Sequence, residues 1–222
     1  MKKICFITTS RADFGTLNEL IKELVKKKIL AQLIISGSHM DRFYGNTQKE
    51  IFGKKKYLIK KVKMITQNKN SKSVALSFAD CLTKFTKTLS QLNPDAFVVF
   101  GDRYEMLAAT ISSYILRIPI VHIAGGEKTA GSIDDGFRHS ISKLANLHFP
   151  IAEQYRKRLI QLGENPKTIF NYGSLHFEKI KKNNYLSKDK LEKKLNIKFY
   201  KKNLIITYHP DSINNEKNLK NL

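Results

Sequence analysis

Residues 96–127 read AFVVFGDRYEMLAATISSYILRIPIVHIAGGE, and this stretch decides the fold class. Residues 96–100 form a continuous apolar run, which is typical of a strand buried on both faces of a sheet. Apolar residues at helical spacing follow over residues 106–116, and a second apolar run covers residues 118–123. A strand, a helix and a strand in this order predict a βαβ unit with two parallel strands.

The same alternation extends from this unit in both directions. Further strand-like runs cover residues 4–9, 30–36 and 169–172. Helix-like runs cover residues 16–28, 74–92, 137–147 and 152–162. This order predicts the α/β class, with a Rossmann-like, doubly wound and mostly parallel sheet.

The chain changes character after Gly173. Residues 179–203 are rich in lysine and asparagine and predict a surface helix with a linker. A new apolar run begins at Leu204 and reads as a buried strand that ends near His209 and Pro210. We therefore expect a first domain over residues 1–178, a linker over 179–203, and the truncated start of a second domain over 204–222.

Composition excludes several classes of protein. The chain has 222 residues, of which 41% are hydrophobic, so a sizeable core is expected. No apolar run reaches the roughly 18 residues that a membrane span needs, and no signal peptide is recognisable, so we expect a cytoplasmic protein without membrane partners. Cys5 and Cys81 lie in apolar contexts and are predicted to be buried free thiols. No cysteine and histidine spacing suggests a structural zinc site.

The formal net charge of +21 comes mostly from lysine. The lysines are scattered in pairs and triplets, and no zinc finger or RNP motif accompanies them. We interpret them as solvated surface lysines and expect no nucleic-acid partner, although a positive field favours anionic ligands.

Polar residues follow four of the predicted strands. The segments are Ser10-Arg11-Ala12-Asp13, Gly37-Ser38-His39, Gly101-Asp102-Arg103 and His122 to Glu127. Because ligands bind beyond the carboxyl ends of parallel strands, these segments predict the rim of an active site.

Each candidate also has a structural interpretation. Arg11 is placed to bind a phosphate at a helix start, but an ion pair with a neighbour is the alternative. Asp102 is either a general acid or base or a helix N-cap, and Asp134 with Asp135 forms a possible N-cap pair. His39 is either a ligand contact or a hydrogen-bonded loop histidine.

Five motifs together resemble the UDP-N-acetylglucosamine 2-epimerase family. They are Ser10-Arg11-Ala12-Asp13, Gly101-Asp102-Arg103-Tyr104-Glu105, His122-Ile-Ala-Gly-Gly-Glu127, the segment from Asp134 to Leu144, and Tyr208-His209-Pro210. The pattern is most similar to the hydrolysing branch, which feeds the synthesis of sialic and related nonulosonic acids. The resemblance implies the first half of a GT-B-like two-domain fold, a nucleotide sugar bound between the two halves, and a homo-oligomer at full length.

The resemblance also implies a reaction and its residues. A base removes the proton from C2 of the sugar while UDP leaves C1, and water then adds to the 2-acetamidoglucal to give N-acetylmannosamine. No metal or redox cofactor is implied. Residues that match catalytic positions are Asp102, Glu127, Asp134 and His209, and those that match substrate or nucleotide contacts are Arg11, Asp13, His39, Arg103, His122, Arg138 and His139. Ala124 departs from the family pattern, because several members carry a carboxylate there. Either Glu127 takes that role or the role is distributed differently among the other residues.

Several alternatives stay open on the sequence alone. The substrate is UDP-N-acetylglucosamine, UDP-diacetylbacillosamine or a GDP-linked analogue, and a non-hydrolysing epimerase would return UDP to the intermediate. A glycosyltransferase fits the carboxylates less well. A non-catalytic module that binds nucleotide sugars is the alternative outside enzymes. We expect weak or no turnover from the 222 residues alone.

Overall fold

The computed structural model describes residues 1–42, 45–52, 57–64, 70–182 and 185–207. Its centre is a sheet of six parallel strands in the order β3-β2-β1-β4-β5-β6. The strands are β1 (Lys3–Thr8), β2 (Leu30–Ile35), β3 (Leu58–Lys61), β4 (Ala96–Phe100), β5 (Ile120–Ile123) and β6 (Leu147–Phe149). The order runs outward from β1 in both directions, which confirms the predicted doubly wound sheet.

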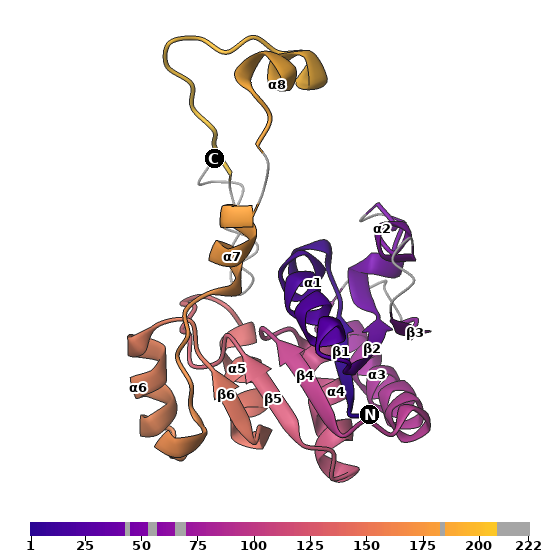
Figure 1. The fold of residues 1–222 in the computed structure, drawn as a ribbon. Helices are drawn as coiled ribbons and strands as arrows, with labels where there is room; N and C mark the ends of the chain where they lie inside the picture. The colour runs from indigo at the N-terminus through magenta and orange to yellow at the C-terminus, as the bar shows by residue number, and fades with distance from the viewer. Residues whose placement is uncertain (43–44, 53–56, 65–69, 183–184, 208–222) are drawn as a thin grey trace.

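Helices cover the two faces of this sheet unequally (Figure 1). They are α1 (Arg11–Lys26), α2 (Lys49–Phe52), α3 (Ser71–Leu92), α4 (Tyr104–Ile115), α5 (Asp134–Leu144), α6 (Glu153–Gln161), α7 (Leu175–Lys182) and α8 (Lys188–Leu195), with short 3-10 turns at Gly37–Met40 and Pro166–Thr168. One core cluster packs buried residues of α3, α4 and α5, such as Phe85, Met106 and Ile141, against one face. A second cluster packs Leu17 and Ile21 of α1 against the other face.

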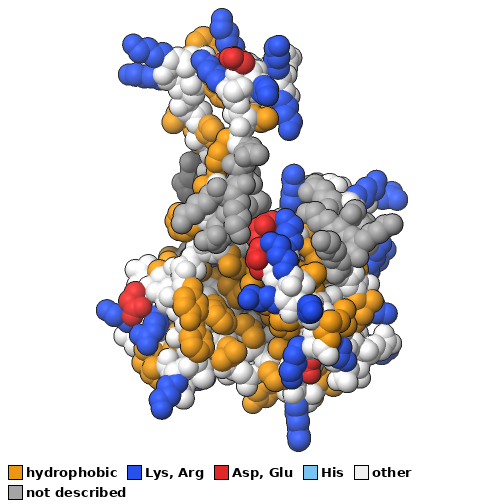
Figure 2. Space-filling view, in the orientation of Figure 1, with side chains coloured by type: hydrophobic (Ala, Val, Ile, Leu, Met, Phe, Trp, Pro, Cys, Tyr) orange, Lys and Arg blue, Asp and Glu red, His pale blue; other side chains and the backbone are white. Residues whose placement is uncertain are grey.

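That second face stays open over β4, β5 and β6. Figure 2 shows hydrophobic side chains gathered there. A hollow of about 760 Å³ is lined by Phe6, Val98, Val121, Ile123 and Phe149, together with residues 172–175. Most of its lining is apolar, and Tyr172 and Ser174 are the lining residues that carry a polar side-chain group.

The N-terminal end of α1 differs from the prediction. The helix begins at Arg11, whereas residues 10–15 were expected to form a loop before a helix over 16–28. The reason is a capping box, in which Ser10 accepts a hydrogen bond from the backbone of Asp13 while the Asp13 carboxylate accepts one from the backbone of Ser10. Arg11 is therefore the first residue of the helix.

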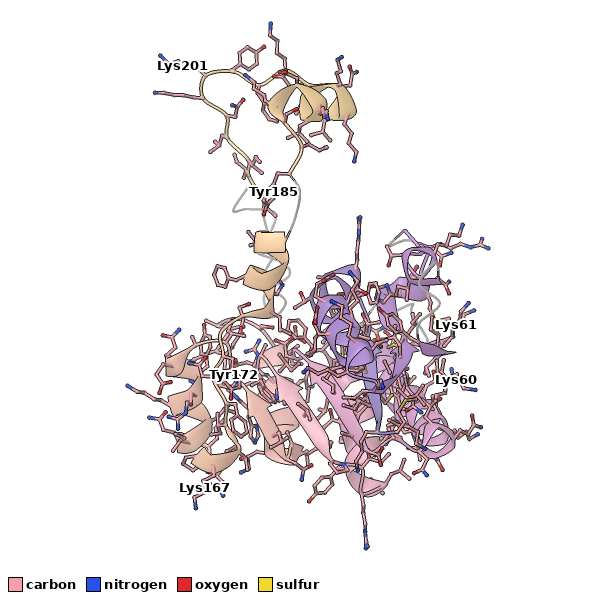
Figure 3. The ribbon with its side chains drawn as sticks, in the orientation of Figure 1. Lys60, Lys61, Lys167, Tyr172, Tyr185 and Lys201 are labelled. Atoms are coloured by element: carbon pink, nitrogen blue, oxygen red, sulfur yellow. The ribbon has the colours of Figure 1, made fainter. Side chains whose placement is uncertain are left out.

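Three strand assignments also need correction. Residues 145–147 do not continue α5, because the chain turns at Ala145 and Leu147 starts β6. Residues 169–172 make only one isolated bridge, between Ile169 and His148, and form no strand. The lysine-containing strand β3 was not predicted. As an edge strand it places Lys60 and Lys61 at the border of the sheet (Figure 3), where charged side chains discourage pairing with another chain.

The segment beyond Gly173 leaves the sheet as an arm that contains α7 and α8 (Figure 1). Leu204, Ile205 and Ile206 are 80–90% exposed and belong to no strand, so the prediction of a buried strand is wrong for these described residues. Among the described residues no strand lies beside them, and a strand requires hydrogen bonds from a neighbour. The predicted domain boundary after residue 178 falls inside α7 and stays a prediction.

Cys5 and Cys81 are buried and free, as predicted. Within the described ranges, no helix combines the length and the apolar character that crossing a membrane requires.

Candidate active site at the carboxyl edge of the sheet

The candidate site lies where β4 and β5 end and α5 begins. Two tight turns bring these segments together. The carbonyl of Ile123 accepts a hydrogen bond from Gly101, which follows β4. After β5, Gly126 has a φ of 78°, and a Cβ atom there would lie 2.5 Å from the carbonyl oxygen of Tyr155. Only glycine fits this position, so the turn that carries Glu127 is fixed against α6.

Arg138 is the centre of the site's polar network. Its guanidinium is almost fully buried and forms an ion pair with Asp102 and a second one, at 2.9 Å, with Asp135. It also donates hydrogen bonds to the carbonyl of Glu127 at 3.1 Å and to Thr129 Oγ1 at 3.0 Å. A planar guanidinium with several donors can hold such a set in one arrangement, so Arg138 joins the ends of β4 and β5 to α5.

Glu127 and Asp134 have the electrostatic properties of proton carriers. Burial raises the pKa of the half-buried Glu127 carboxyl, and the charge of Asp102 acts in the same direction. Burial and Asp102 likewise raise the pKa of Asp134, which accepts a hydrogen bond from Ser132. Carboxylates whose pKa moves towards neutrality are the usual candidates for general acid and base work.

Asp102 differs from these two carboxylates because it is paired with Arg138. Its charge is therefore balanced within the protein, while it contributes to the field around Glu127 and Asp134. The three predicted acid/base residues thus come together, but in two different environments.

Arg103 stands beside them at the end of β4. Its guanidinium contacts Glu105, with 2.9 Å between Nη2 and Oε1, and its side chain is 46% exposed. Arg11 is exposed at the first position of α1. Both side chains are exposed, and their contact with a phosphate stays a prediction.

Three predicted contact residues are instead buried among protein partners. Asp13 accepts hydrogen bonds from the backbone of Thr9 and Ser10. His39 lies 2.9 Å from Thr8 Oγ1 through Nε2 and 2.8 Å from Thr47 Oγ1 through Nδ1, and it is 1% exposed. The polar atoms of Asp13 and His39 thus have protein partners in this structure, and their contact with a ligand stays a prediction.

The third is His122, which is fully buried. Its Nε2 lies 2.9 Å from the carbonyl oxygen of Gly101 and its Nδ1 lies 3.0 Å from Ser142 Oγ. Burial lowers its pKa to about 4. His122 is therefore a neutral link between the end of β4 and α5, and its contact with substrate stays a prediction.

Of the remaining predictions, His139 lies on α5 with its Nε2 3.6 Å from Asp135. His209 lies outside the described residues. The described residues contain no group of three or more His, Cys, Asp or Glu side chains that could hold a metal ion.

The structure adds His176, which no motif indicated. This exposed residue of α7 lies with its Nε2 2.9 Å from Thr16 Oγ1 and its ring 6.1 Å from that of Phe100, and its charge favours the ionised form of Glu127. It reaches the rim from 160 residues away in sequence, so only the tertiary fold reveals it.

Comparison with known proteins finds one family over most of the chain. The family model described as UDP-N-acetylglucosamine 2-epimerase matches residues 22–222. A protein of Campylobacter jejuni named GDP/UDP-N,N'-diacetylbacillosamine 2-epimerase (hydrolyzing) is 41% identical, across the whole chain and 58% of its own length. A Legionella pneumophila protein named UDP-N,N'-diacetylbacillosamine 2-epimerase (hydrolyzing) is 34% identical, across 95% of the chain and 56% of its own length.

Solved structures show the same fold. A UDP-GlcNAc 2-epimerase from Neisseria meningitidis, in a structure with bound UDP-GlcNAc, matches 87% of the chain and 52% of its own chain with a TM-score of 0.68 and 19% identity. The chain spans between about half and three fifths of the length of these three relatives.

Proposed function

The chain belongs to the UDP-N-acetylglucosamine 2-epimerase family, and on this premise we propose that it forms the N-terminal half of a hydrolysing nucleotide-sugar 2-epimerase. The observation that carries the proposal is the pair of half-buried carboxylates with raised pKa, Glu127 and Asp134, beside the ion pair of Arg138 and Asp102. Two proton-handling groups at the carboxyl edge of a parallel sheet are what an elimination followed by an addition requires.

The proposed reaction has two steps. A carboxylate of the site takes the proton from C2, the electron pair of that C–H bond forms a C1=C2 double bond, and the C1–O bond breaks so that UDP leaves with its electrons. Water then adds across the double bond, with OH bonded to C1 and a proton delivered to C2 on the opposite face. Glu127 and Asp134 are the proposed base and acid. The charges of Asp102 and Arg138 act on the pKa of both carboxyl groups.

Departure of UDP places negative charge on the diphosphate. Arg103 and Arg11 are two exposed cations of this edge, and we propose that they stabilise it. His176 stands at the same rim. Several family members carry a carboxylate at the position of Ala124, which directly follows β5. Glu127 is the described carboxylate nearest to that position in sequence.

For the substrate we propose a UDP-linked N-acetylated sugar. UDP-N-acetylglucosamine follows from the family, and UDP-diacetylbacillosamine is the second candidate because the relatives at 41% and 34% identity carry that name. A homo-oligomer at full length and a cytoplasmic location are further proposals that rest on the resemblance and on the sequence.

The test is turnover by a version extended through the second domain, offered each sugar in turn. Release of UDP together with the free 2-epimerised sugar, identified by NMR, is the expected result. The variants E127Q and D134N should each lose roughly 10²- to 10⁴-fold in kcat, while E153Q, on the exposed surface of α6, should match the parent. A UDP-linked epimer as product would instead identify the non-hydrolysing reaction. Binding without turnover would identify a non-catalytic module.

A further inference from the structure

Glu105 is a charged residue in an unusual place. It is the second residue of α4 and is only 1% exposed, next to Met106 and Leu107 of the core. An ionised carboxylate is costly to bury unless it is paired. The first turn of a helix offers partial compensation, because the helix dipole favours negative charge there.

The cation that balances Glu105 is Arg103, two residues earlier. Nε of Arg103 donates to Oε1 and Oε2 at 3.2 and 3.3 Å, and Nη2 donates to Oε1 at 2.9 Å. This is a side-on contact, which uses the Nε–H and one Nη2–H of the guanidinium. Of the five N–H groups of an arginine, three remain, and in the part of the chain that the structure describes they make no hydrogen bond.

The side chain of Arg103 stays accessible although it is paired. The Arg103 side chain is 46% exposed although its partner is almost completely buried. Its charge lowers the pKa of Asp134, against the larger effect of burial, and the Asp13 carboxylate of α1 acts on Arg103 in turn. The guanidinium thus lies within electrostatic range of α1 and of the proton-handling carboxylate of α5.

We propose that Glu105 is a positioning residue, which holds Arg103 side-on so that its Nη1 edge is presented to the diphosphate of the nucleotide. This inference rests on the proposed function for the identity of the anion. A guanidinium that is fixed before binding loses less conformational freedom when it pairs with a phosphate. Glu105 itself touches no ligand and acts through Arg103.

The test uses the 222-residue chain and inorganic pyrophosphate as the probe. The Nε–Hε signal of Arg103 is followed by NMR and assigned by its loss in R103K. In the parent chain, pyrophosphate should shift this signal. In E105Q, the shift should require roughly tenfold more pyrophosphate, because one charge-assisted contact is lost and the guanidinium is free to rotate.

A matched control removes a similar carboxylate elsewhere. Glu164 is 11% exposed and pairs with Lys143 at 2.6 Å, at the opposite end of α5 from Asp134. E164Q should bind pyrophosphate as the parent does. If E105Q does not fold, E105D keeps the charge while it shortens the side chain, and the same weakening is expected. The double variant E105Q/R103K should bind no more weakly than R103K alone.

Two outcomes overturn the proposal. One is a parent chain in which pyrophosphate leaves the Arg103 signal unmoved, and the other is an E105Q variant that binds as tightly as the parent. In the extended enzyme, E105Q should raise KM for the UDP-sugar more than it lowers kcat and should leave the pH profile in place. Absence of turnover by the extended parent would contradict the proposed function, while the pyrophosphate result would still decide the role of Glu105.

Discussion

The Nε2 atom of His122 lies 2.9 Å from the carbonyl oxygen of Gly101, one residue before Asp102. A carbonyl can only accept, so Nε2 carries the hydrogen and Nδ1 of the neutral ring is an acceptor. Nδ1 lies 3.0 Å from Oγ of Ser142, whose hydroxyl also lies 3.1 Å from the carbonyl oxygen of Arg138. A single tautomer therefore ties the end of β4 to the helix that carries Arg138. Asp134 and Asp135 lie on the same helix. Protonation of His122 would disturb this link, so the free energy of unfolding should depend on its neutral form.

The first prediction concerns pH. The pKa of His122 is lowered to about 4, whereas an unfolded histidine titrates near 6.5. The unfolded chain therefore takes up a proton at a higher pH than the folded chain, and stability falls as the pH drops from 6.5 towards 4. The loss from this residue is at most about 3 kcal/mol. Urea unfolding at pH 7.5 and pH 5 should show a smaller difference in H122Q than in the parent, and equal differences would contradict the assignment.

The second prediction concerns Gly125. A Cβ atom there would lie 2.8 Å from Nδ1 of His122 and 2.9 Å from Oγ of Ser142. G125A should therefore cost about 1–3 kcal/mol of unfolding free energy. Gly136 on α5 is the matched control, because a Cβ there meets nothing within 4 Å, and G136A should be neutral or stabilising by up to about 1 kcal/mol. Thermal or urea unfolding followed by circular dichroism measures both, and equal effects would argue against the close packing.

The third prediction concerns Arg138. Replacing it by leucine leaves Asp102 and Asp135 without their cation, and the expected loss of stability is about 3–5 kcal/mol. R138K keeps the charge but loses the fork of donors, so it should lie between the parent and R138L. In a double-mutant cycle, D102N should recover part of the loss in R138L. Strict additivity of the two changes would show that the pair is not coupled.

The fourth prediction separates activity from stability. Burial disfavours the ionised forms of Glu127 and Asp134, so their folded pKa lies above the unfolded value and their charges oppose folding at neutral pH. The unfolding free energy of E127Q and D134N should therefore equal that of the parent or exceed it by roughly 0.5 kcal/mol. Both variants should nevertheless lose roughly 10²- to 10⁴-fold in kcat in the extended enzyme. A clear loss of stability in either variant would assign that carboxylate a structural role.

Much of this architecture follows from sequence patterns. The apolar runs of β4 and β5 predicted the sheet, because a strand buried on both faces has a nearly continuous apolar sequence. The polar residues after these strands pointed to the edge where the candidate site lies. The start of α1 was predictable as well. Ser10 and Asp13 have the spacing of a capping box, which is a stronger signal than the apolar periodicity that begins later.

Other features depend on tertiary structure. Leu147 continues the helical periodicity of α5, yet β6 forms there because Asn146 bonds to Ile120 and the strand pairs with β5. The motifs of His39 and Asp13 did not predict that these residues are buried. From sequence alone, a loop histidine or a helix-capping carboxylate cannot be distinguished from a residue that contacts a ligand. His176 lies beside the site because it contacts Thr16. The two residues are 160 positions apart, so the contact could not be predicted from the sequence.

The open apolar face over β4, β5 and β6 changes how this protein must be assayed. Dyes such as anilinonaphthalene sulfonate fluoresce when they enter hydrophobic surface, and their signal is often taken as a sign of a loosely packed intermediate. Here the native fold itself offers a hollow of about 760 Å³ lined by aromatic and aliphatic side chains. The dye should therefore fluoresce in the presence of the folded chain, and its fluorescence should decrease as urea unfolds the sheet. Near-ultraviolet circular dichroism, which reports the packing of tyrosine and phenylalanine, is the spectroscopic measure to trust for this molecule.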